Sequence, residues 1–336
     1  MNLEPLNDLA FLRETGEAAR RLGFELYAVG GCVRDWLLGV TSADIDFLCG
    51  ADPKALVSEL TVKPGGVSSV ADSAIGPRQA RVTPPPASGP AGPASAKQLG
   101  GSASGGKVGQ AGGGVTTFER FLTTRLFLAD GRRLDFAVFR KESYLKPAAL
   151  PSVSRAVSAA EDLKRRDFAC NALAVSLLPG PGFGELLDPC GGADDIKKGV
   201  LRVLHERSFV DDPTRLYRAA RFAGRFGWKL ETKTYRLAIE AVKTEMPSLL
   251  SRERLRNELL KLLSEKDPLP AFELLKELDA LKFLHEKFVF GPEVSAASGL
   301  AARLSILARL MGGAGRDFVG SLKLTRAMTK EIERGS

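Results

Sequence analysis

Histidine and cysteine are scarce in this chain, and their scarcity excludes several kinds of site. Only two histidines occur among 336 residues, so a histidine-based catalytic triad or a histidine metal cluster is not expected. The four cysteines are scattered without a paired Cys-x-x-Cys spacing, which argues against both a zinc site and a disulfide framework. We therefore expect free thiols and no zinc.

The sequence also lacks a long uninterrupted apolar segment. No run approaches the roughly 20 residues that a helix needs to cross a bilayer, so no membrane segment is expected. The first residues, MNLEPLNDLAF, are acidic and do not show the basic and then apolar pattern of a signal peptide. Together these two absences predict a cytoplasmic protein.

Positive charge is in excess, with 48 Lys and Arg against 40 Asp and Glu and a formal net charge of +8. Such an excess suits a polyanionic partner, because each neutralised phosphate releases counterions. A soluble basic protein without such a partner would have the same charge, so the excess permits a nucleic-acid ligand without identifying one. The length is sufficient for two or more domains.

Short helical and strand patterns alternate in the N-terminal part. Apolar residues at helical spacing predict a helix over 8–22, with Gly23 as its stop. Alternating acidic and apolar residues predict a half-buried strand over 44–48. Three further elements are expected around these two: a strand over 25–29, a helix that begins after Gly30 and Gly31, and a helix over 52–60.

Residues 63–114 have a different composition from the rest of the chain. This segment is rich in Gly, Pro, Ala and Ser and nearly free of large apolar residues. Such a segment cannot bury enough apolar surface to offset the entropy of ordering it. We interpret it as a disordered insertion in the first domain; the alternative is a loop that becomes ordered on binding RNA.

A hairpin is predicted after the insertion, with the strands TTRLFLAD and RRLDFAVF joined at Asp130-Gly131. In the second strand Asp135 points away from the face that carries Leu134 and Phe136. From about Glu161 onward the apolar spacing is helical, and one expected apolar stripe consists of Leu216, Ala219, Ala220 and Ala223. The expected fold class is α+β, with a small mixed sheet and its helices followed by a helical remainder.

Asp44 and Asp46 carry the clearest chemical signal. Residues two apart on a strand share a face, so both carboxylates project together while Ile45 packs inward. Two close carboxylates repel unless a cation lies between them, and hard oxygen ligands of this kind suit Mg²⁺ with triphosphate oxygens. Asp135, on the strand expected beside this one, is placed to add a third carboxylate. Two metals held in this way can activate a 3′-hydroxyl and stabilise a pyrophosphate leaving group; an exposed strand face is the alternative.

The segment VGGCVRDWLLG (29–39) lies just upstream of these carboxylates. Gly30 and Gly31, between a strand and a helix, let backbone N–H groups approach a phosphate, and the helix N-terminus adds positive potential. Arg34 lies one turn into the helix and is placed to meet the same triphosphate. A tight strand-to-helix turn with Arg34 on the surface would explain the segment equally well.

GGCVRDWLLG followed by DIDF resembles the opening of the class II tRNA nucleotidyltransferase and bacterial poly(A) polymerase family, members of the polymerase-β-like nucleotidyltransferase superfamily. Further segments that resemble this family follow in its order. They are EDLKRRDFACNALA (161–174), LLDPCGGADDIKKGVLR (186–202), SFVDDPTRLYRAARFAGRFGW (208–228) and SRERLRNELLKLL (251–263). The resemblance implies a nucleotidyltransferase head over 1–178, a helical neck over 179–263 that selects the base and binds RNA, and a helical RNA-binding body over 264–336.

The segment 161–174 has a physical interpretation beside the resemblance. An arginine of the pair Arg165-Arg166 can contact the ribose and phosphates of an incoming nucleotide, and Asp167 can orient it through a paired hydrogen bond. Asn171 can donate and accept at the sugar edge. A surface salt bridge at the start of a helix is the alternative for the arginines.

In the neck, Asp211, Asp212, Arg215 and Arg218 are the candidate base-reading residues. An aspartate accepts from the exocyclic amine of cytosine or adenine, and an arginine donates to the adjacent ring nitrogen. Uracil and guanine present a carbonyl oxygen instead, and such misplaced partners can discriminate by about 10⁴ or more. An aspartate before Pro213 also caps the helix that follows, which explains part of its presence.

Asp211 and Arg221 are two further residues of the neck motif. The family usually has a glutamate where this chain has Asp211, which leaves open whether both CTP and ATP are used. Arg221 lies half a turn round the helix from Asp212 and is assigned to phosphate contact.

The resemblance implies a Mg²⁺-dependent, template-independent enzyme that adds CCA, or only the terminal A, to tRNA 3′ ends from CTP and ATP. The segment 141–160 is present, whereas CC-only members typically shorten it. The main alternative is a bacterial poly(A) polymerase acting on mRNA, although the arginine-rich stretch usual after the DxD strand in those enzymes is not seen. A non-catalytic RNA-binding protein on the same scaffold is a remote alternative, which the carboxylate pair opposes.

Overall fold

The computed structural model describes residues 9–42, 44–62, 114–119, 122–128 and 132–334. All but one residue of the predicted insertion 63–114, and the whole Asp130-Gly131 turn, lie outside these ranges. Contacts divide the chain into two compact units. The head unit comprises 1–140, 157–159 and 174–186, and the helical unit comprises 141–156, 160–173 and 187–336. The division into 1–178, 179–263 and 264–336 stays a prediction.

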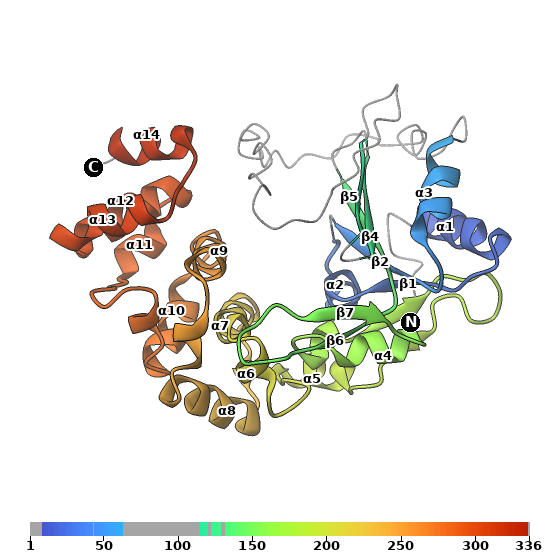
Figure 1. Cartoon of the computed structure of the whole chain (residues 1–336), viewed down its shortest axis with the longest axis horizontal. Helices are drawn as coiled ribbons and strands as arrows, with labels where there is room; N and C mark the ends of the chain where they lie inside the picture. The colour runs from blue at the N-terminus through green and yellow to red at the C-terminus, as the bar shows by residue number, and fades with distance from the viewer. Residues whose placement is uncertain (1–8, 43, 63–113, 120–121, 129–131, 335–336) are drawn as a thin grey trace. The chain divides into compact units, whose positions relative to one another are not determined.

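The head unit is built on a mixed sheet with the strand order β3-β4-β5-β2-β1-β8-β9 (Figure 1). Strands β2 and β5 are parallel, and the pairs β1–β2, β1–β8, β3–β4 and β4–β5 are antiparallel. The bounds are β3 Val115–Phe118, β4 Thr123–Phe127, β5 Arg133–Val138, β2 Ile45–Cys49, β1 Leu26–Val29, β8 Ala174–Ser176 and β9 Leu186–Leu187. The predicted strand over 25–29 and the antiparallel pairing of the predicted hairpin strands are therefore confirmed. The strand predicted over 44–48 is also present, but it begins at Ile45, so the prediction that Asp44 lies on it is wrong.

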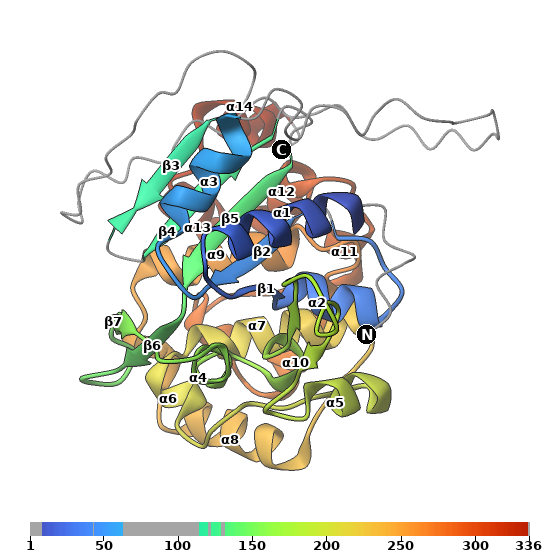
Figure 2. The same ribbon diagram turned by 90° about the vertical axis from the view of Figure 1, so that its right-hand side faces the viewer.

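Helices cover this sheet because the alternating strands bury one apolar face. α1 (Leu9–Arg21) and α3 (Pro53–Val62) lie against each other, and α3 packs on β4 and β5 (Figure 2). Phe47 of β2 stacks on Phe136 of β5 with ring centroids 4.6 Å apart, and Phe11 of α1 meets Phe47 edge-on at 6.4 Å. This aromatic cluster fixes which face of β2 and β5 is buried.

Strand β8 was not predicted, and it interrupts the helical pattern expected from about Glu161 onward. Its residues pair with β1 through Tyr27↔Ser176, Ala28↔Val175 and Val29↔Ala174. Ala174 and Val175 are both fully buried. A strand of three residues is too short to show alternation, so the sequence offers no periodic signal for it.

The helical unit begins with the two-stranded hairpin of β6 (Arg140–Ser143) and β7 (Ser152–Arg155). The pair β10 (Val200–Leu201) and β11 (Lys229–Leu230) adds a short parallel ladder. The helices are α4 Ala159–Lys164, α5 Gly192–Lys198, α6 Ser208–Asp211, α7 Thr214–Phe226, α8 Thr232–Lys243, α9 Arg252–Leu263, α10 Leu269–Glu277, α11 Pro292–Ala296, α12 Leu300–Leu310, α13 Gly313–Ser321 and α14 Arg326–Arg334. Among the described helices, none combines the length and apolar character needed to cross a membrane.

Helix α7 is the centre of this unit and packs on both α9 and α10. Its predicted apolar stripe is confirmed, since Leu216, Ala219 and Ala220 have no exposed surface. Near its end the backbone of α10 comes so close that a Cβ on Gly224 would lie 2.8 Å from the amide nitrogen of Ala271. Glycine at this position therefore allows the two helices to approach closely.

We expect Gly224→Ala to lower the free energy of unfolding by about 1–3 kcal/mol, because overpacking against backbone outweighs the gain in helix propensity. The matched control is Gly320→Ala on α13, where a Cβ would meet no neighbour within 4 Å among the described residues. That variant should be unchanged or more stable by up to about 1 kcal/mol. Urea unfolding of both variants measures the difference, and equal effects would contradict the close approach.

Candidate active site

The head unit brings two of the predicted carboxylates together. Asp46 of β2 and Asp135 of β5 are direct partners in the parallel ladder. Their flanking residues Ile45, Phe47 and Phe136 are buried, so both carboxylates lie on the face opposite the aromatic cluster. Asp44 lies in a bend just before β2, with its side chain 52% exposed. The predicted strand placement of Asp46 and Asp135 is therefore confirmed, whereas a metal-binding role for all three stays a prediction.

Two arginines that the sequence did not single out surround these carboxylates. Arg125 faces Asp135 across the β4–β5 ladder and donates from Nε at 2.7 Å and from Nη2 at 3.1 Å. Arg133 lies within 3.1 Å of Asp44 and 3.3 Å of Asp135. The hydrogen bond to Asp135 raises the pKa of Arg125 against the effect of burial, and the charges of Asp135, Asp46 and Asp44 add to it. Arg125 thus lies within electrostatic range of all three carboxylates.

The carboxylates of Asp44, Asp46 and Asp135 can bind a divalent cation only together with other oxygen ligands. Within the described ranges, no three His, Cys, Asp or Glu side chains converge closely enough to hold a metal ion by themselves. Carboxylate oxygens paired in register are, however, the hard ligands that Mg²⁺ takes together with water and triphosphate oxygens. Arg125 and Arg133 supply positive charge beside carboxylates that would otherwise repel one another.

The glycine turn has the predicted geometry. Gly30 follows β1 with φ 82° and ψ −125°, a conformation that favours glycine, and α2 (Gly31–Leu37) begins directly after it. The side chain of Arg34 is largely buried, and its Nε and Nη2 donate to Asp35 at 3.0 and 2.7 Å. The alternative of a surface arginine is therefore wrong, because burial and the pair with Asp35 hold the side chain inside. Its contact with a triphosphate stays a prediction.

In the helical unit, Arg218 joins the buried Asp167 and Asn171 in one cluster, with the Arg218 side chain 29% exposed. The guanidinium of Arg218 binds Asp167 Oδ2 through Nη2 and through Nε, the latter at 2.9 Å. Asp167 Oδ1 accepts from the amide of Asn171 at 3.0 Å and from the backbone of Phe168 at 2.9 Å. Burial by itself would raise the pKa of Asp167, but Arg218 and Asn171 lower it to about 2. The structure thus joins residues from two separate sequence motifs.

Arg165 and Arg166 form ion pairs inside the unit. Both bind the fully buried Asp162, at 2.9 and 3.2 Å, and Arg165 also binds Glu142 of β6. The side chains are only 14% and 17% exposed, so the surface salt bridge considered above is not what the structure has. Glu142, together with the hairpin that carries it, is a residue that the sequence did not signal.

The candidate base-reading residues Asp211, Asp212 and Arg215 each bind different partners in the structure. Asp212 caps α7 as predicted: its Oδ1 accepts from the backbone and hydroxyl of Thr214 at 3.0 and 2.6 Å. Arg215 is buried and donates to Ser208 Oγ at 2.7 Å and to the carbonyl of Arg165 at 3.1 Å. Asp211 lies 3.2 Å from Arg207. The side chains of Asp212 and Arg215 therefore do not pair with each other.

Arg221 likewise contacts residues outside the group of candidate base-reading residues. It lies 3.2 Å from Glu265, a carboxylate that Arg225 also binds, and stacks over the ring of Phe222 at 4.5 Å. Among the described contacts of Arg221, none joins it to Asp212. Its assignment to phosphate contact stays a prediction.

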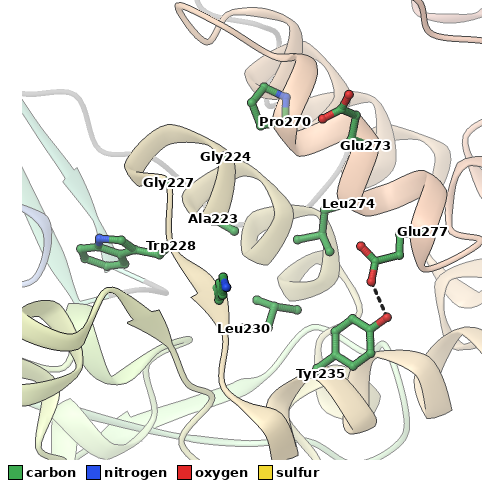
Figure 3. Close-up of a pocket in the computed structure, with 11 residues that line it drawn as sticks. Ala223, Gly224, Gly227, Trp228, Leu230, Tyr235, Pro270, Glu273, Leu274 and Glu277 are labelled. Carbon is green, nitrogen blue, oxygen red and sulfur yellow. Dashed lines mark hydrogen bonds between the residues drawn. The ribbon is translucent and has the colours of Figure 1, made fainter.

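A cavity of about 520 Å³ opens between the end of α7, β11, α8 and α10 (Figure 3). Glu273 and Glu277 of α10 line it, and Tyr235 of α8 donates to Glu277 at 2.5 Å. None of the predicted site residues lines this cavity. Two carboxylates in its wall disfavour a triphosphate, so we place the candidate site at the residues described above.

We expect Arg218→Gln to destabilise the protein by about 3–5 kcal/mol at pH 7, because it leaves the Asp167 carboxylate buried without its counter-charge. In the wild type the folded pKa of about 2 lies below the ordinary 3.8, so this group contributes about 2 kcal/mol above pH 4 that is lost as pH falls towards 2. In the variant, the counter-charge of Arg218 is gone and burial holds the folded pKa of Asp167 above its wild-type value, so protonation costs the folded state less than in the wild type.

The difference in unfolding free energy between the two proteins should therefore shrink from pH 7 to pH 4, as measured by urea unfolding. Arg236→Gln, a substitution of an exposed arginine on α8, is the control and should show no such trend. A difference for Arg218→Gln that is the same at both pH values would contradict the inferred pKa.

Comparison with known proteins matches two family models to this chain. The family model described as "Poly A polymerase head domain" matches residues 26–74 and 110–202, and "Probable RNA and SrmB- binding site of polymerase A" matches 236–296. A protein named "A-adding tRNA nucleotidyltransferase" from Halalkalibacterium halodurans is 34% identical over 83% of this chain and 54% of its own length. One of the same name from Geobacter sulfurreducens is 34% identical over 86% of this chain and 27% of its own length.

The chain therefore spans about half the length of the first of these relatives and about a quarter of the second. A solved tRNA nucleotidyltransferase, "complexed with a primer tRNA and an incoming ATP analog", superposes with a TM-score of 0.68 and 27% identity over 95% of this chain and 82% of that one. The head model, the RNA-binding model, the relatives and the superposition agree. The chain belongs to the tRNA nucleotidyltransferase and poly(A) polymerase family.

Proposed function

We propose that this protein is a template-independent nucleotidyltransferase that adds AMP to the 3′ end of tRNA, with release of pyrophosphate. The observation that carries the proposal is the register pair of Asp46 and Asp135, flanked by Arg125 and Arg133. Adenylate addition to tRNA is supported by the similarity to proteins named A-adding tRNA nucleotidyltransferase. A cytoplasmic location is part of this proposal, as is the use of Mg²⁺ rather than zinc, because the donors are oxygens.

The carboxylates of the head unit would hold the metal. Asp44 and Asp46, with Asp135 beside them, are the residues placed to ligate Mg²⁺, which when bound would supply charge stabilisation for phosphoryl transfer. Arg125 and Arg133 already contact these carboxylates and would balance charge around the triphosphate. The glycine turn at Gly30-Gly31 offers backbone N–H groups to a phosphate.

The helical unit would select the base. Asp212 offers a carboxylate that can accept from the exocyclic amine of adenine or cytosine, and guanine and uracil would present it with a carbonyl oxygen. The ion pair of Asp167 and Arg218 holds α7, the helix that follows Asp212, against the segment that carries Asp167. The basic charge of the chain, +8, favours an RNA substrate.

Purified protein with Mg²⁺ should extend a tRNA transcript that ends in CC by a single A when offered ATP. Transcripts that end before CCA and after the first C, offered CTP and ATP, measure whether cytidines are added as well. Extension of all three would make the protein a full CCA-adding enzyme. Long A tails on unrelated RNA would make it a poly(A) polymerase, and no incorporation would refute the proposal.

Asp46→Asn should lower incorporation at least about 100-fold, because the amide cannot balance the charge of a bound cation. The matched control is Asp194→Asn on α5, whose side chain is 69% exposed and pairs only with Lys197 among the described residues. Its activity should stay within about twofold of the wild type. Equal activity of the two variants would remove the carboxylates of the head unit from the mechanism.

Chelation by EDTA should abolish incorporation, and added Mg²⁺ should restore it, because the carboxylates cannot neutralise a triphosphate themselves. Binding of Mn²⁺, followed by its electron paramagnetic resonance signal, gives a readout that does not depend on turnover. Asp46→Asn should weaken this binding in the presence of ATP, and unchanged Mn²⁺ affinity would contradict the assignment.

A further inference from the structure

Arg254, in the first turn of α9, connects two segments that lie far from it in the sequence. Its Nη2 donates to Asp212 Oδ1 at 2.6 Å, and its Nη1 donates to the carbonyl of Ala148 at 2.7 Å. The side chains of Arg254 and Asp212 are each 22% exposed, so water screens the contact only in part. No sequence pattern distinguishes this arginine from its neighbours Arg252 and Arg256.

The contact matters because of what it does to the Asp212 carboxylate. Oδ1 accepts three hydrogen bonds, from the backbone N–H of Thr214, from its hydroxyl and from Arg254. Within the described part of the chain, no hydrogen bond to Oδ2 is seen. The carboxylate is thus held by one oxygen, and its other oxygen has a fixed direction in which to accept a donor from a ligand.

Ala148 connects the loop between β6 and β7 to the segment that carries Asp212. It has φ 57°, a left-handed conformation that is unusual for alanine, and its N–H donates to the carbonyl of Val210 at 3.1 Å. Both backbone polar groups of Ala148 are therefore bound, one by α6 and the other by Arg254. The loop between β6 and β7 is held against the segment that carries Asp211 and Asp212.

Tyr144, in the same loop, gives independent support for this proximity. Its hydroxyl donates to Glu142 at 3.0 Å. The pKa of Tyr144 is raised by burial first, then by Glu142 and also by Asp212, while Arg215 lowers it. The loop thus lies within electrostatic range of both candidate base-reading side chains.

We infer that Arg254 is a positioning residue for base selection, which fixes the Asp212 carboxylate so that Oδ2 meets an exocyclic amine and rejects a carbonyl. The inference rests on the proposed function for the identity of the ligand. Without Arg254 the carboxylate can rotate about its side-chain bonds, and either oxygen or an intervening water can accommodate guanine or uracil. Selectivity, more than overall affinity, should then be lost.

The test compares Arg254→Gln and Arg254→Lys with the control Arg252→Gln, an exposed arginine on the same helix. Equilibrium binding of ATP and of GTP in the presence of Mg²⁺ gives the preference directly, and thermal unfolding reports the fold. Arg254→Gln should reduce the ATP-to-GTP preference about tenfold or more, since one charged hydrogen bond that orients the acceptor is lost. Arg254→Lys should restore part of the preference, because an ammonium can bind Asp212 but cannot bridge to Ala148 in the same geometry.

With CC-ended tRNA, Arg254→Gln should raise KM for ATP and allow GMP incorporation, whereas Arg252→Gln should do neither. An equal loss of ATP and GTP binding, or a loss that follows the unfolding temperature and is not rescued by lysine, would overturn the positioning role. A wild type that binds ATP and GTP equally would overturn it as well. A wild type that prefers ATP but incorporates nothing would refute the transferase proposal alone, and the binding ratios would still decide the role of Arg254.

Discussion

The ion pair between the buried Asp167 and the partly exposed Arg218 is the interaction on which the helical unit depends. It joins residues 51 positions apart, one in the bend that follows α4 and the other in the middle of α7. Asp167 also binds Asn171 and the backbone beside it, so its remaining lone pairs are satisfied within the protein. A buried charge is tolerated only with such partners, and the pair therefore fixes the register of one motif against the other.

The head unit has the opposite electrostatic arrangement. Asp46 and Asp135 are partners in a parallel ladder, where like charges destabilise the sheet. The aromatic stack of Phe47 on Phe136 holds the two strands in this register from the other face. Arginines beside the carboxylates reduce the repulsion without removing the charge. An arrangement that costs stability and is retained by packing elsewhere is typical of a functional site.

The sequence predicted those parts of the fold that have a strong local pattern. Alternation in DIDFL gave β2, and the stripe of Leu216, Ala219 and Ala220 gave the buried face of α7. It did not reveal β8, which is too short to alternate, or the partners Arg125 and Arg254. Arg125 depends on the register of a hairpin, where one residue of turn length decides which side chain faces Asp135. Arg254 depends on a tertiary contact across 42 residues, for which a single sequence has no signal.

Strand β8 has a consequence for the order in which the chain can fold. It completes the pairing of β1, yet two segments of the helical unit, 141–156 and 160–173, precede it in the chain. During synthesis on the ribosome, β1 therefore keeps an open edge until parts of the other unit have already been made. The head cannot mature as an N-terminal domain that folds first and alone, and a single cut in the chain cannot release it intact.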